Sequence, residues 1–143
     1  MNKSDIEVYK DIQKNAERAM KSIDALQDKV YDRDMASLLI RQNMQYANLR
    51  NKAISKMVDA HSDTYHSSAF TDFLIKGAIQ VNTLFNTSTS HIAELMIQAN
   101  SKGLMYMWKS LNMHGRLAKE AVEFADEFIQ LEEKNIRILR EYL

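Results

Sequence analysis

The stretch AVEFADEFIQLEEKNIRIL, residues 121–139, carries apolar residues at the three- and four-residue spacing of one helical face. That face consists of Ala121, Ala125, Phe128, Ile136 and Leu139. Two polar residues, Glu132 and Asn135, fall inside the stripe at about 100° per residue, so both are predicted to point inward. The pattern predicts a long final helix, from Arg116 to about Tyr142.

The same periodicity runs through the earlier part of the chain. In the first helix, Ser4 followed by Glu7 three residues later predicts a capping box. The polar run 28–34 predicts the first turn, and a second helix follows it and ends near residues 61–64.

The middle of the chain predicts two shorter helical pieces. One spans about residues 68–85, and the hydroxyl and amide run 86–90 breaks or strains it, because such side chains compete for backbone hydrogen bonds. Helix resumes after this run and ends at residues 112–115, where Gly115 is predicted to form a left-handed cap.

Composition supports a purely helical fold. The chain has 143 residues, no proline, no cysteine and three glycines, which leaves few residues for the many turns of a β-rich fold. The sequence predicts one all-α domain over residues 1–143, an antiparallel four-helix bundle. Its third helix is either broken or preceded by an extra helix near residues 68–85.

A resemblance becomes visible in the second half of the chain. Residues 124–136, FADEFIQLEEKNI, resemble the closing helix of ferritin-like proteins, rubrerythrin relatives included, and residues 90–98, SHIAELMIQ, are similar to a segment of small ferritin-like bundles. The resemblance implies a dinuclear iron or manganese site with six carboxylate and histidine ligands. Glu132 matches the glutamate of that motif, whereas Asn135 stands where histidine is expected, and residues 42–45 replace the Glu-x-x-His of the second helix.

The resemblance therefore implies the fold and speaks against the family's chemistry, because neutral amides are poor ligands for iron. Three readings of Glu132 stay open: a side chain that reaches water at the edge of the stripe, a buried network with Gln42, Tyr46 and Asn135, or a metal ligand. No cofactor is expected. The alternative is a noncanonical iron, manganese or zinc site that uses Glu94 and Glu132 with His61, Asp63 and His66.

The segment from residue 67 to residue 112 has few charges and apolar residues on two sides. One side of its second half carries Ile97, Leu104, Trp108 and Leu111, and in its first half Ile75 and Ile79 lie opposite Phe70, Leu74, Gly77 and Val81. A helix that is apolar on two sides is either central in the monomer or buries its second side against a partner. We expect a homodimer with the Ile97, Leu104, Trp108 and Leu111 face at the contact.

The sequence excludes several classes of function, but it limits the function less closely than it limits the fold. Lys+Arg and Asp+Glu number 19 each, so no basic face for nucleic acid is expected, and no secretion signal or membrane span is apparent, which predicts a cytoplasmic protein. No phosphate loop or nucleophile motif is present, so we expect no catalysis and action through protein–protein contacts. The remaining alternative is a carrier of small apolar ligands in a cavity among Phe70, Phe73, Phe124, Phe128 and Trp108.

Overall fold

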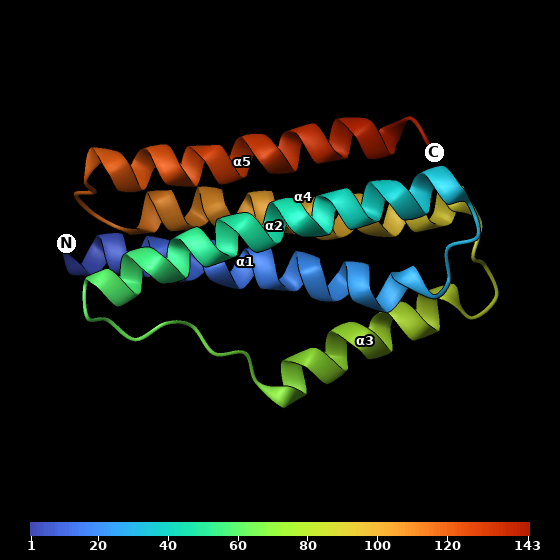
Figure 1. The fold of residues 1–143 in the computed structure, drawn as a ribbon, viewed down its shortest axis with the longest axis horizontal. Helices are drawn as coiled ribbons and strands as arrows, with labels where there is room; N and C mark the ends of the chain where they lie inside the picture. The colour runs from blue at the N-terminus through green and yellow to red at the C-terminus, as the bar shows by residue number, and fades with distance from the viewer.

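The computed structural model describes residues 1–143 and contains five helices and no strands (Figure 1). The helices are α1 (Lys3–Gln27), α2 (Arg33–Asp59), α3 (Ala69–Thr83), α4 (Thr89–Met113) and α5 (Lys119–Arg140). The all-α prediction is confirmed, and the 68–85 segment forms an extra helix, α3. None of the five helices is both long enough and apolar enough to cross a membrane.

Two helical hairpins form the body of the molecule. α1 packs along α2, and α4 packs along α5, with α1 also against α4 (Figure 1). Residues 60–88 join the hairpins and run back along the molecule, so that α2 and α4 point in the same direction. The core between these helices contains 26 buried apolar residues.

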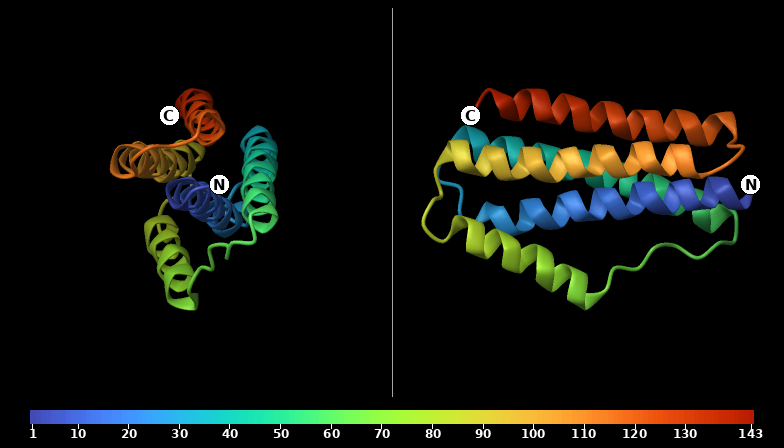
Figure 2. Two further views of the ribbon diagram at one scale, coloured as in Figure 1. Left: turned by 90° about the vertical axis from the view of Figure 1, so that its left-hand side faces the viewer. Right: turned by 180° about the vertical axis from the view of Figure 1, so that it is seen from behind.

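The most central helix is α1, which contacts each of the other four helices (Figure 2). A central position in the monomer was one of two alternatives for the charge-poor middle segment, and its first helix, α3, does not occupy that position. α3 lies outside the bundle against α1 and buries only Ile79 and Thr83 fully. α4 buries a stripe that includes Met96, Gly103 and Met107, because it is packed between α1 and α5.

Local signals set the helix ends, and three of them differ from the sequence prediction. α1 begins at a capping box made by Asn2 and Asp5 rather than by Ser4 and Glu7. The Asn2 side chain accepts from the Asp5 backbone N–H at 2.8 Å, and the Asn2 N–H donates to the Asp5 carboxylate at 3.4 Å.

At the other end of the chain, Gly115 does not adopt a positive φ, because α4 runs into an extended residue, His114, at its C-terminus. The final helix begins at Lys119 instead of Arg116, since the Asp5 carboxylate accepts the Ala118 N–H at 2.9 Å and holds the preceding turn against α1. Elsewhere the predicted breaks hold: Ser68 and Ser88 cap α3 and α4.

Candidate functional site

A cluster of buried polar side chains lies inside the bundle between α2 and α5. The structure places Gln42, Tyr46, Glu132 and Asn135 there, each with at most 1% of its surface exposed. The Asn135 amide donates to the Tyr46 hydroxyl at 3.1 Å, and the ring of Tyr46 packs against that of Phe128 at 6.3 Å between centroids. Glu132 is therefore not a solvent-reaching side chain at the edge of the stripe.

The carboxyl group of Glu132 has an unusual environment. Burial raises its pKa to about 8, and the neighbouring Tyr46 hydroxyl offsets part of that rise. The pKa of Tyr46 is raised well above its ordinary value, first by burial and then by the Glu132 charge. No Lys, Arg or His nitrogen lies within 4 Å of Glu132, so the acid is largely neutral at pH 7.

Gly103 on α4 makes room for this carboxyl group. A Cβ atom at residue 103 would lie 2.5 Å from Glu132 Oε2, closer than real Cβ contacts allow. Small residues four apart, such as Ala99 and Gly103, are typical of close approach between helix backbones, whereas the neighbour of Gly103 here is a side chain. The two residues are 29 positions apart on different helices, so no local spacing rule could pair them.

Several buried polar atoms in this region have no hydrogen-bond partner within the chain. They comprise both amide atoms of Gln42, both amide atoms of Asn100, Oδ1 of Asn135 and Oε1 of Glu132. A buried polar group without a partner costs about 1–3 kcal/mol. Asn100 was not a predicted site residue, although the 100° arithmetic puts it on the same stripe as Met96 and Gly103.

The donor set does not fit the dinuclear metal site that the ferritin-like resemblance implies. Glu132 is the only carboxylate in the cluster, and its neighbours are amides and a phenol, which are weak ligands for iron or manganese. No group of three or more His, Cys, Asp or Glu side chains lies close enough to hold a metal ion.

The residues of the alternative metal site are not brought together. Glu94 is exposed at the start of α4, where its carboxylate lies 3.6 Å from His91 Nδ1. His61, Asp63 and His66 lie in the segment between α2 and α3, at the surface. Glu132 is inside the bundle, so these residues share no site with it.

The predicted interface face is only partly available. Leu104 belongs to the core and is 7% exposed, and Ile97 and Leu111 are half-buried against the core. Trp108, at 48% exposed, is the only one of the four that offers a large accessible surface. Leu104 is therefore a core residue, because α4 uses this side to contact its neighbours.

A larger exposed apolar surface lies on α3, and we call it the α3 face. It consists of Phe70, Phe73, Leu74, Val81, Leu84 and Phe85. The side toward α1 carries Ile75 and Ile79 and an ion pair between Lys21 of α1 and Asp72. The sequence showed that α3 has two opposite apolar sides, one with Ile75 and Ile79 and the other with Phe70, Leu74 and Val81. It did not show which of the two sides faces the bundle.

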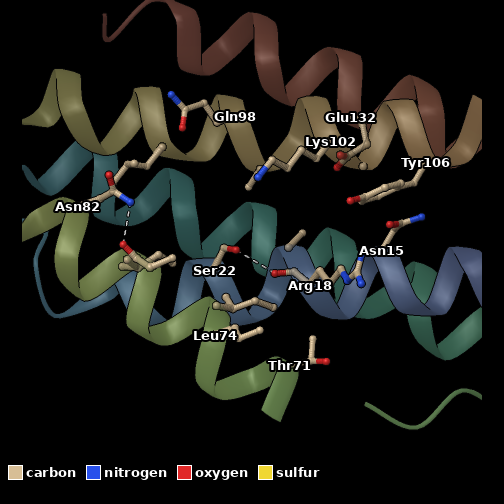
Figure 3. Close-up of a pocket in the computed structure, with 17 residues that line it drawn as sticks. Asn15, Arg18, Ser22, Thr71, Leu74, Asn82, Gln98, Lys102, Tyr106 and Glu132 are labelled. Atoms are coloured by element: carbon tan, nitrogen blue, oxygen red, sulfur yellow. Dashed lines mark hydrogen bonds between the residues drawn. The ribbon is translucent and has the colours of Figure 1, made fainter. Parts of the chain in front are cut away.

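A groove of about 370 Å³ lies between α1, α3 and α4, and Figure 3 shows the residues along it. None of the five aromatic residues proposed for an apolar cavity lines it: Phe124 and Phe128 belong to the core, and Phe70 and Phe73 face solvent. The carrier cavity is therefore not where the sequence placed it.

Comparisons with protein-family models, with curated proteins and with solved structures returned no match.

Proposed function

We propose that the chain acts through protein–protein contact, as a homodimer formed by two copies of the α3 face. The observation that carries the proposal is the orientation of α3, which turns its more apolar side away from the bundle. Phe70, Phe73 and Phe85 are 69%, 71% and 95% exposed. Contiguous apolar patches of this kind mark interaction sites in proteins that are otherwise polar at the surface.

The area of the α3 face matches the requirement of a dimer. An aromatic side chain has about 150–250 Å² of surface to bury. At about 200 Å² each and with their exposed fractions of 69%, 71% and 95%, the three phenylalanines alone offer roughly 470 Å². Leu74, Val81 and Leu84 bring the apolar area close to the ~800 Å² per partner of a standard interface. A two-fold axis across the helix pairs the patch with its own copy.

Charge favours a second copy of the chain over a charged partner. The formal net charge is zero, so two copies do not repel each other over long range. Within α3 the charged residues Asp72 and Lys76 lie away from the α3 face, and Asp72 is already paired with Lys21. An apolar, uncharged patch is best matched by an identical one.

We further propose that the fold is ferritin-like. What supports this is the order of the elements: two antiparallel hairpins, α1–α2 and α4–α5, joined by one connection that runs the length of the bundle (Figure 1). Ferritin-like bundles use one such crossover. In this chain the crossover carries α3, so the element that joins the hairpins also supplies the proposed interface.

Light scattering after size exclusion tests the dimer. Wild type is expected to elute as a dimer at about 100 µM. Phe73→Glu and Val81→Glu each place a charge on the α3 face, and they should elute as folded monomers with unchanged helicity. Ser55→Glu is the matched control, because it adds the same charge to an exposed position of α2, outside the α3 face.

Two outcomes contradict the proposal. One is a wild type that is monomeric at this concentration, and the other is a dimer that Phe73→Glu and Val81→Glu leave intact. Leu104→Glu separates the α3 face from the face predicted on α4. Because Leu104 is a core residue, this variant should lose helicity instead of dissociating as a folded monomer.

A further inference from the structure

The groove between α1, α3 and α4 combines apolar walls with a charged end. Its apolar wall residues include Ala19 of α1, Ile75 and Ile79 of α3, and Leu95 and Ala99 of α4. Figure 3 shows Asn15, Arg18, Lys102 and Glu132 toward one end of the groove and Asn82 toward the other. A molecule lying along the groove therefore meets polar groups at one end and apolar side chains beside them.

The acid of the groove is Glu132, which reaches it from α5 behind α4. Its Oε2 atom occupies the space over Gly103, and both residues line the groove. The side chain is only 1% exposed, and its other oxygen has no hydrogen-bond partner. A buried carboxyl group with no cation beside it is a strong acceptor for a ligand that brings its own positive charge.

The same end of the groove carries two cations that no carboxylate neutralises. Neither Arg18 of α1 nor Lys102 of α4 has a carboxylate oxygen within 4 Å. Arg18 lies over the ring of Tyr106 at 5.3 Å, which holds its guanidinium at the groove. Together with Glu132, these side chains line one groove with a carboxylic acid and two cations.

We propose that the groove binds a small zwitterion, an α-amino acid with an apolar side chain. The ammonium group pairs with Glu132 over Gly103, the carboxylate pairs with Arg18 and Lys102, and the side chain packs against Ile75, Ile79 and Leu95. A volume of about 370 Å³ holds a molecule of this size. This inference does not require the proposed dimer, because Ile75 and Ile79 lie on the opposite side of α3 from the α3 face, and Leu74 is the one residue that belongs to both the face and the groove.

Proton release on binding gives this site a specific signature. Empty, Glu132 is protonated over most of the neutral range, since burial raises its pKa to about 8. A bound ammonium group favours the ionised form, so binding releases a proton below about pH 8 and tightens as the pH rises toward that value. The other titratable groups around it are Tyr46 from α2, whose pKa burial raises well above its ordinary value, Arg18 from α1, and Lys102 and Tyr106 from α4.

Titration calorimetry tests the proposal with three amino acids, L-leucine, L-methionine and L-phenylalanine. Two analogues of leucine are titrated in the same way. The analogues are 4-methylpentanoate, which lacks the amino group, and 3-methylbutylamine, which lacks the carboxylate. At least one of the three amino acids is expected to bind, and if leucine binds, both analogues should bind at least about tenfold more weakly. No binding of any of the three amino acids up to about 10 mM overturns the proposal.

The pH dependence separates the zwitterion from a plain carboxylate. The affinity of the bound amino acid should rise between about pH 6 and 8, with proton release seen as a heat that depends on the buffer. A ligand with a carboxylate and no amino group binds better while Glu132 is protonated and uncharged, because the ionised Glu132 repels it. The affinity of such a ligand should therefore fall over the same pH range. If 4-methylpentanoate binds as tightly as leucine, the groove is a carboxylate site and the proposal is wrong.

Variants identify the groups that contact the ligand. Glu132→Gln should weaken amino-acid binding at least about tenfold and abolish proton release, and at about pH 6, where Glu132 is already protonated, it should leave any 4-methylpentanoate binding unchanged. Arg18→Gln changes a half-buried surface residue, so it provides the test even if Glu132→Gln does not fold, and it should weaken both ligands. Lys109→Gln, an exposed cation on α4 outside the groove, is the control. Unchanged amino-acid affinity in either Glu132→Gln or Arg18→Gln overturns the proposal.

Discussion

Glu132 shows how a single residue can decide whether the interior of a helical bundle is inert or chemically useful. A buried carboxyl group is tolerated here because it can remain protonated, and because Gly103 leaves space for it. The other buried polar groups of the cluster on α2 and α5 are a phenol and amides, which neither neutralise its charge nor bind iron strongly. The acid is therefore poised between its two protonation states near neutral pH.

Stability should fall as the pH rises through the neutral range. The folded chain raises the pKa of Glu132 from 4.5 to about 8, so the folded state binds the proton that the unfolded state has already lost. By linkage, the unfolding free energy falls by about 2–4 kcal/mol between about pH 5 and 8 and levels off above that. Urea unfolding of wild type and Glu132→Gln at several pH values measures this, and the difference between the two curves isolates Glu132. Parallel curves would contradict the assignment.

Substitution of Gly103 should be costly only while Glu132 is present. Alanine normally stabilises a helix interior by up to about 1 kcal/mol relative to glycine. At residue 103 its Cβ meets Glu132 Oε2, so we expect Gly103→Ala to destabilise by about 1–2 kcal/mol and Gly103→Leu by several. In a Glu132→Ala background Gly103→Ala should become neutral or stabilising. Gly77→Ala, where a Cβ meets nothing within 4 Å, is the control for helix propensity.

At the scale of the helix, the start of α1 does two tasks. The Asn2 and Asp5 pair caps α1, and Asp5 also accepts the Ala118 N–H at the start of α5. Through these bonds the first turn of the chain sets the position of the last helix. A cap at Ser4 would leave Asp5 pointing elsewhere and the Ala118 N–H without this partner.

Alanine substitutions distinguish the two possible caps. Asn2→Ala should lower the unfolding free energy by about 1 kcal/mol, and Asp5→Ala by about 1–2 kcal/mol because the Ala118 N–H also loses its acceptor. Ser4→Ala is the matched control and should change stability by less than about 0.5 kcal/mol. Thermal or urea unfolding measures all three. A larger loss for Ser4→Ala than for Asn2→Ala would place the cap where the sequence pattern put it.

The sequence predicted helix extents better than helix orientation, and the reason is physical. Periodicity and polar breaks are local, so they were enough to locate α3 and α4 on either side of the run 86–90. Both sides of α3 are apolar, and only its position against α1 decides that Ile79 is buried and Phe73 exposed. The pairing of Glu132 with Gly103 likewise depends on how α4 and α5 pack. Apart from its exact ends, each helix can be predicted from its own residues, whereas the site depends on how the helices pack together.

For the whole molecule, the connection between α2 and α3 is the exposed link between two well-packed halves. His61 adopts a positive φ of 55° just after α2, and residues 61, 63 and 66 are exposed. Two side chains of α1 hold the segment. The Gln13 amide donates to the Tyr65 carbonyl and accepts the Tyr65 N–H, both at 2.9 Å, and the Lys21 ammonium donates to the Ser67 hydroxyl at 2.6 Å. The rest of the segment makes few contacts with the bundle.

Limited proteolysis should cut this connection first. A protease that cleaves beside aspartate is expected to act at Asp63 before it acts at the aspartates within helices, because cleavage needs exposed backbone that can unfold locally. Mass spectrometry of early time points identifies the site, and native sizing shows whether the nicked chain stays together. Early cleavage inside α1 or α4, or fragments that separate in native buffer, would contradict this view of the molecule.

The long crossover also makes the chain divisible. A cut at residue 62 leaves one fragment with the α1–α2 hairpin and another with α3 and the α4–α5 hairpin, and each fragment holds half of the interior polar cluster. Tyr46 belongs to the first fragment, while Gly103 and Glu132 belong to the second. Separately expressed, the two pieces form a complementation pair. Because Glu132 becomes buried only when they join, their reassembly takes up a proton and can serve as a reporter of acidity near neutral pH.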